Sequence, residues 1–170
     1  MTTEEVNFIR QTGRRPFRFM EIVDSYFFIL FPLVIFLIGS TLLLNTFGHA
    51  DKEAFSSIII FIVGLVSLYW TTKRLWDNQR FKRIRTSKNT EDNIQKIKEA
   101  INKLDWELYL DNKERVIAFT KTTWFSWGEQ VTIIADGKDI LINSRPTKQP
   151  ITIYEDERNL KRFLHEFNLS

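Results

Sequence analysis

The sequence contains no cysteine, and it has only 6 glycines, 4 prolines and 2 histidines. Without cysteine the chain forms neither disulfides nor thiolate metal centres, and two histidines at unrelated positions supply no zinc-binding pattern. The scattered glycines form no phosphate-binding loop of the G-x-x-x-x-G-K or G-x-G-x-x-G type. We therefore predict no cofactor, no metal site and no catalytic residues, and interpret the chain as a non-enzyme.

Charge is absent from two long apolar runs near the N-terminus. Residues 26–44 include 14 Leu, Ile, Val or Phe among 19 residues, and residues 54–72 include 10 among 19. A helix of this length extends about 28 Å, which is close to the hydrocarbon thickness of a bilayer. The segment between the runs is short and polar. The sequence therefore predicts a membrane α-helical hairpin made of two transmembrane helices.

Lysine and arginine are unevenly distributed around the predicted spans. Four precede the first span, one lies in the turn, and seven lie in residues 73–88. The positive-inside rule then places both termini in the cytoplasm, as in a multi-pass protein of the bacterial inner (plasma) membrane. The basic segment is either a topology signal alone or also a site for anionic lipid headgroups. The predicted membrane-surface residues are Lys73, Arg74, Arg80, Lys82, Arg83 and Arg85.

The net charge of +3 comes from this basic segment and not from the region that follows it. Residues 89–170 carry 12 Lys or Arg and 14 Asp or Glu. A nucleic-acid-binding domain would carry a basic patch on its own folded surface. We therefore predict no nucleic-acid partner.

The region after Lys88 has the pattern of a small soluble α+β domain. Apolar residues recur at helical spacing in residues 90–105 and 155–167. Between them the sequence predicts extended segments at residues 106–110, 115–121, 123–135, 138–143 and 151–154, joined partly by turns at Asp111-Asn112 and Asp136-Gly137. The predicted order is helix, antiparallel β-meander, helix, with both helices on one face of the sheet and the other face open to water or to a partner.

These patterns divide the chain into four parts. They are a cytoplasmic N-terminal segment (1–24), a transmembrane hairpin (25–72), a basic juxtamembrane linker (73–88) and a soluble α+β domain (89–170).

Three short segments carry a resemblance to a known type of domain. They are T-T-W-F-S-W-G-E-Q, I-L-I-N-S-R-P and N-L-K-R-F-L, all within residues 106–167. Together they resemble an uncharacterised bacterial α+β domain family, in which strands are followed by a Ser-Arg pair and by a terminal helix that begins near an Asn. The positions matching that pattern are Ser144, Arg145, Asn159 and Arg162. The resemblance implies a domain type and no activity.

Large aromatic residues are concentrated in one predicted strand, where Trp124, Phe125 and Trp127 lie close together. Alternate residues of a strand point to opposite faces, so one aromatic is expected on a face that the helices leave open. Trp124, Trp127 and Arg145 are therefore candidates for binding a partner. The alternatives are core packing with one half-exposed Trp, and contact with the bilayer.

Acidic residues cluster at Glu155-Asp156-Glu157 and at Asp136 with Asp139. A helix start and a turn account for both clusters.

The leading hypothesis is a membrane-anchored cytoplasmic interaction domain, a non-catalytic adaptor or accessory subunit of a membrane complex that binds a protein partner or a second copy. One alternative is an oligomeric channel or transporter component, and another is a membrane-bound hydrolase with a carboxylate site at Glu155 or Asp156.

Overall fold

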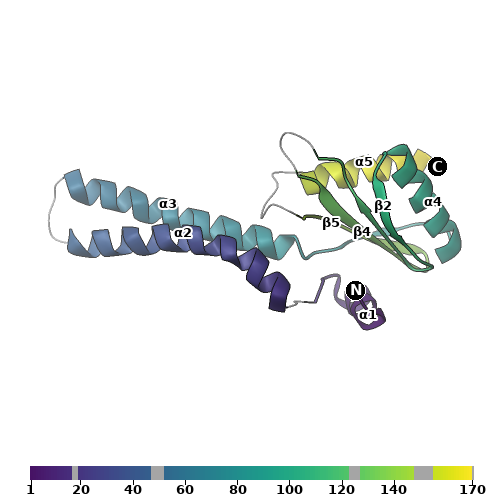
Figure 1. Cartoon of the computed structure of the whole chain (residues 1–170), viewed down its shortest axis with the longest axis horizontal. Helices are drawn as coiled ribbons and strands as arrows, with labels where there is room; N and C mark the ends of the chain where they lie inside the picture. Colours follow the sequence, from purple (N-terminus) through teal and green to yellow (C-terminus); the bar gives the residue numbers. More distant parts are fainter. Residues whose placement is uncertain (17–18, 47–51, 123–126, 148–154, 170) are drawn as a thin grey trace. The chain divides into compact units, whose positions relative to one another are not determined.

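The computed structural model divides the chain into two compact units (Figure 1). Phe17–Asp77 form the hairpin unit, and Met1–Pro16 together with Asn78–Ser170 form the α+β unit. The structure describes the chain except residues 17–18, 47–51, 123–126, 148–154 and 170, and the side chains of residues 19–28, 52–53 and 169 are likewise outside the description.

The hairpin unit consists of two paired helices, α2 (Phe19–Asn45) and α3 (Lys52–Asp77). The prediction of a helical hairpin is confirmed. Within α3, the stretch Ala54–Asp77 is long and apolar enough to cross a membrane, and α2 contributes a shorter apolar stretch, Ile29–Asn45.

Two glycines bring the hairpin helices into close contact. A Cβ atom on Gly39 would lie 2.6 Å from the Phe61 backbone nitrogen, and one on Gly64 would lie 2.6 Å from the Phe36 backbone nitrogen. The Phe36 and Phe61 rings are 5.2 Å apart between centroids. Since small residues let helix backbones approach, this pair of glycines sets the spacing of the two helices.

The α+β unit is built on a five-stranded antiparallel sheet with the order β1-β5-β4-β3-β2. The strands are β1 (Lys82–Arg85), β2 (Glu107–Asp111), β3 (Arg115–Phe119), β4 (Glu129–Asp136) and β5 (Asp139–Pro146). The predicted meander is confirmed for β2 to β5. Within the strand predicted over residues 123–135, the structure has β4, which begins at Glu129. Residues 123–126 and the strand predicted over residues 151–154 lie outside the described residues.

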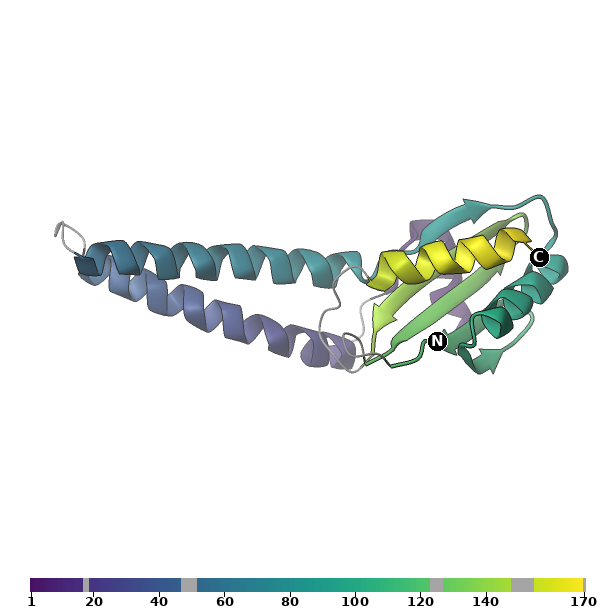
Figure 2. The same ribbon diagram turned by 90° about the horizontal axis from the view of Figure 1, so that it is seen from above.

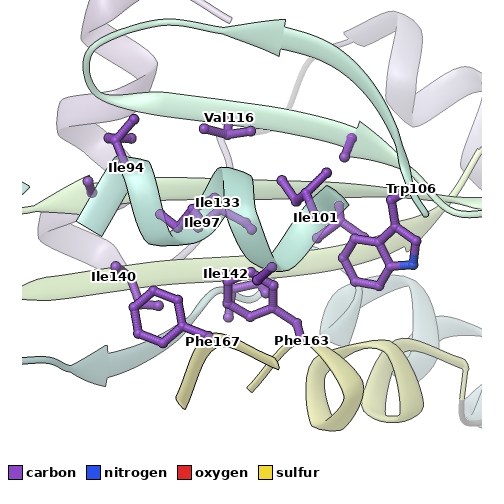
Figure 3. Close-up of a cluster of buried hydrophobic side chains, with 14 residues drawn as sticks. Ile94, Ile97, Ile101, Trp106, Val116, Ile133, Ile140, Ile142, Phe163 and Phe167 are labelled. Carbon is purple, nitrogen blue, oxygen red and sulfur yellow. The ribbon is translucent and has the colours of Figure 1, made fainter. Parts of the chain in front are cut away.

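Helices α4 (Thr90–Lys103) and α5 (Glu155–Leu169) cover one face of this sheet, as predicted. Figure 2 shows both helices, teal and yellow, over the same strands. The core between these layers contains isoleucines from α4 and the sheet, Trp106, and Phe163 and Phe167 from α5 (Figure 3). The side chain that caps α4 is Asn89, whose Oδ1 accepts a hydrogen bond from the Asp92 backbone N–H.

The opposite face of the sheet is not open, which corrects the expectation that it would face water or a partner. Helix α1 (Thr3–Thr12) lies against it, and Figure 2 shows this helix behind the strands. Val6 and Ile9 are buried there against a second apolar cluster that includes Phe81, Ile134 and Leu141. The N-terminal segment through Pro16 therefore belongs to the folded unit.

The predicted basic linker also contains regular structure. Its first residues complete α3, and residues 82–85 form the edge strand β1, with Ile84 opposite Ile140 of β5. The sequence K-R-I-R has only one apolar residue. An edge strand with solvent on its outer side does not require a run of alternating apolar residues. Charge alone therefore could not reveal this strand.

The chain segments that connect the two units are hydrogen-bonded to each other. The Arg15 N–H donates to the Gln79 carbonyl (3.0 Å), and the Phe81 N–H donates to the Gly13 carbonyl (2.8 Å). The Asn143 side-chain amide of β5 donates to the carbonyls of Asn78 (3.0 Å) and Arg80 (2.8 Å). Both connections therefore leave the α+β unit at one place, beside Asn143 of β5.

Candidate functional site

The candidate site is a buried polar cluster, the Glu129 cluster, formed by Glu129, Ser144 and Asn159. The Ser144 hydroxyl donates to Glu129 Oε2 (2.5 Å), and the Asn159 side-chain amide donates to the same oxygen (2.9 Å). Glu129 and Asn159 are buried, and Ser144 is partly buried. A buried carboxylate is stable only when such donors replace its lost water.

The sheet and α5 bring these three residues together. Glu129 is the first residue of β4. Ser144 lies near the end of β5 and pairs with Val131 of β4. Glu129, Val131 and Ser144 share the face that α4 and α5 cover, because alternate strand residues share a face. Asn159 lies one helical turn before Phe163, so α5 presents both to this face.

The backbone around Glu129 is held by Thr120 and Gly128. The Glu129 N–H donates to the Thr120 hydroxyl (2.9 Å). Gly128 has a φ of 93°, and a Cβ atom there would lie 2.9 Å from the Thr120 carbonyl oxygen. A residue other than glycine would be strained at this position.

The cluster joins three elements through one carboxylate oxygen. A serine hydroxyl next to a carboxylate is also part of what a nucleophile-and-base pair requires. Among the residues that the structure describes, no three His, Asp or Glu side chains lie together as a metal site. The arrangement is well suited to fixing α5 on the sheet.

The sequence pointed to part of this cluster. Ser144 and Asn159, two of the four positions that carried the family resemblance, meet at Glu129. Arg145 lies on the other sheet face and donates to Gln130 Oε1 (3.1 Å), and Arg162 is exposed on α5. Glu129 was missed, because a single glutamate in a strand gives no sign of burial until its donors are known.

The predicted membrane-surface residues occupy different places. Lys73 and Arg74 lie on the last turns of α3, and Arg80, Lys82 and Arg85 are exposed in the α+β unit. Arg83 has partners within its own unit: Nη1 contacts Asp136 (3.0 Å) and Asp139 (2.9 Å), and Nη2 donates to the Arg10 carbonyl (2.6 Å). Hydrogen bonding to Asp139, together with Asp136, raises the pKa of Arg83 although burial opposes it.

Arg83→Gln is expected to loosen α1 by about 1 kcal/mol or less, because the Arg83 side chain is 44% exposed and water screens its ion pairs. Hydrogen exchange of the α1 amides in the full-length protein measures this effect. Arg85→Gln is the matched control from the same strand. Equal α1 protection in the two variants would show that Arg83 does not hold α1.

The remaining predicted residues are placed as follows. Trp127, just before β4, is 61% exposed, and Trp124 lies outside the described residues. Glu155 forms an ion pair with Arg158 (2.7 Å) in the first turn of α5, and Asp136 and Asp139 accept from Arg83. These carboxylates therefore have intramolecular partners, as expected for a helix start and a turn.

Searches with protein-family models and against curated proteins found no match to this chain. The resemblance carried by Ser144, Arg145, Asn159 and Arg162 therefore stays a prediction, and the comparisons place the chain in no family. The function has to be argued from its own residues.

Proposed function

We propose that the chain is a two-span protein of the bacterial inner membrane whose α+β unit is a cytoplasmic interaction domain, a non-catalytic adaptor or accessory subunit of a membrane complex. The proposal rests on which segments of the chain form the α+β unit. This unit combines residues that precede the hairpin with residues that follow it.

The position of α1 supports an even number of crossings. Ile9 is fully buried against the sheet, and Arg10 donates to the Ala135 carbonyl (2.9 Å) and to Glu114 (3.2 Å). Such contacts cannot form across a bilayer, so the N-terminus and the C-terminal domain belong on the same side. If α3 crosses the membrane, α2 has to cross it as well.

The outer surface of the hairpin also supports a lipid environment. Large apolar side chains are exposed along both helices, for example Phe31 at 74%. Exposed apolar area costs roughly 25 cal/mol per Å² in water, and contiguous patches of this kind are typical of membrane contacts. The helices themselves satisfy the backbone polar groups that lipid cannot.

The orientation follows from the basic residues that flank the helices. More of them lie before α2 and after α3 than in the turn, which favours a cytoplasmic α+β unit. The absence of native cysteine makes this proposal simple to test, because a single introduced cysteine is the only thiol in the protein.

Cysteine labelling in intact cells tests the topology. With Asp51→Cys we expect reaction with a membrane-impermeant maleimide, and with Lys113→Cys we expect reaction only after permeabilisation. The cysteine-free parent is the control for background. Labelling at position 113 in intact cells, with protection at 51, would reverse the orientation, and equal labelling at both would contradict the two-span arrangement.

The adaptor role has a separate test. Crosslinking in cells, followed by purification in a mild detergent, is expected to recover the protein in a defined complex or as a homo-oligomer. Recovery as an uncrosslinked monomer, at several crosslinker lengths, would count against an adaptor or subunit.

A further inference from the structure

We propose that the outer face of α3, near the C-terminal end of this helix, binds the headgroup of an anionic phospholipid, with Lys73 contacting the phosphate. We call this surface the Lys73 face, and it consists of Lys73, Tyr69, Trp70 and Trp76. The inference rests on the proposed two-span function, and it replaces a general attraction to basic residues by one defined site. The site lies entirely within the hairpin unit.

Lys73 is the first charged residue after the apolar part of α3. Residues 54–72 carry no charge. From Ala54 to Lys73 the helix rises by about 28 Å, which is close to the hydrocarbon thickness of about 30 Å. When Ala54 lies at one boundary of the hydrocarbon, Lys73 therefore lies at the other boundary, at the level where the phospholipid phosphates begin.

Lys73 lies on the side of α3 that is opposite to α2. The side that packs on α2 carries Gly64, which closely approaches Phe36, and Thr71, seven positions later, is buried. Lys73 is two positions after Thr71, about 200° around the helix, and it is exposed. Within the part of the chain that the structure describes, Lys73 forms no hydrogen bond or ion pair. Its ammonium group is therefore available to an anion.

Three of the four surface neighbours of Lys73 on the helix are aromatic. Residues three and four positions apart lie next to each other on a helix, which places Tyr69 and Trp70 on the turn before Lys73 and Trp76 on the turn after it. All three aromatic residues are exposed. Tryptophan and tyrosine are enriched at membrane–water interfaces, and a lysine can lay its apolar stem on such a surface while its ammonium group reaches a phosphate.

Charge favours a lipid over a second copy of the chain as the occupant. Copies in one membrane have the same orientation, so a two-fold axis between them is parallel to the membrane normal and brings identical residues to the same level. Packing through the Lys73 face would then place two like charges near each other, which is unfavourable. An anionic headgroup has the complementary charge. The fourth neighbour of Lys73 is Asp77, whose negative charge weakens the attraction.

Native mass spectrometry of the purified full-length protein in detergent, with added phosphatidylglycerol or phosphatidylcholine, tests the proposal. We expect several-fold tighter binding of phosphatidylglycerol than of phosphatidylcholine. Lys73→Gln is expected to lower the affinity for phosphatidylglycerol about fivefold, the factor for one basic residue at an anionic surface, and Asp77→Asn is expected to raise it. Arg74→Gln is the matched control, because it removes the same charge one position later, on another side of the helix.

Equal loss of affinity in Lys73→Gln and Arg74→Gln would overturn the proposal, because basic residues would then act without a defined site. Release of bound phosphatidylglycerol by inorganic phosphate would also overturn it, since the occupant would be a soluble anion. A homodimer that excludes the lipid and is strengthened by Lys73→Gln would assign the face to a second copy. Far-ultraviolet circular dichroism checks that each variant is folded. Maleimide labelling at positions 51 and 113 reports the topology separately, so a failure of the proposed function is distinguishable.

Discussion

Glu129→Ala is expected to lower the free energy of unfolding of the α+β unit by about 2–5 kcal/mol. The substitution removes the acceptor of two hydrogen bonds and leaves the Ser144 hydroxyl and the Asn159 amide in a largely buried position. Each unsatisfied buried group costs about 1–3 kcal/mol. Because Asn159 lies in the first half of α5, that part of the helix should open first.

Two variants make this result specific. Glu129→Gln keeps an oxygen acceptor of nearly the same shape and is expected to destabilise much less than Glu129→Ala. Gln130→Ala, at the next position, removes a side chain on the other sheet face. Chemical denaturation of the full-length protein, followed by tryptophan fluorescence, gives the stabilities, and hydrogen exchange locates the opening. Equal stability of Glu129→Ala and Gln130→Ala would show that the Glu129 cluster does not stabilise the α+β unit.

Gly64→Ala is expected to weaken the pairing of α2 with α3 by about 1–3 kcal/mol. The added Cβ would lie 2.6 Å from the Phe36 nitrogen and Cα, and these backbone atoms cannot rotate away. The helices must therefore separate or slide. Gly39→Ala is expected to act in the same way, because its Cβ would meet the Phe61 backbone at 2.6 Å.

Val63→Ala is the control for this effect, because it creates the same residue one position earlier, where the side chain is 50% exposed on the outer surface. Titration of the purified protein with a denaturing detergent, followed by energy transfer between labels on the two helices, measures the pairing. A response to Gly64→Ala no larger than that to Val63→Ala would show that close approach at Gly64 does not determine the hairpin.

Together the two predictions test whether the two units unfold independently. Glu129→Ala acts on the α+β unit, and Gly64→Ala acts within Phe17–Asp77. If each variant changes only its own unit, the units unfold independently. If Gly64→Ala also exposes α1 to hydrogen exchange, the hydrogen-bonded segments at Gly13 and Phe81 transmit the change.

The sequence by itself determined the elements whose signals are local. The two uncharged runs predicted the helical hairpin, because insertion and helix length depend on consecutive residues. The apolar stripes of α4 and α5 predicted their shared sheet face, since helical periodicity is read within a few turns. The Asp136-Gly137 turn predicted the β4–β5 hairpin, and Gly137 has the expected positive φ, 61°.

Only the tertiary structure decided which distant residues meet. Helix α1 is buried through Ile9 against Phe81 and Leu141, and strand β1 is defined by its pairing with β5. The Glu129 carboxylate is buried because donors come from β5 and α5. Arg83, predicted from its charge to be a membrane-surface residue, also contacts Asp136 and Asp139. A charged side chain looks the same in the sequence whether it lies on a free surface or in a polar cluster. Its position is stabilised by partners that are distant in sequence, and only the tertiary structure identifies them.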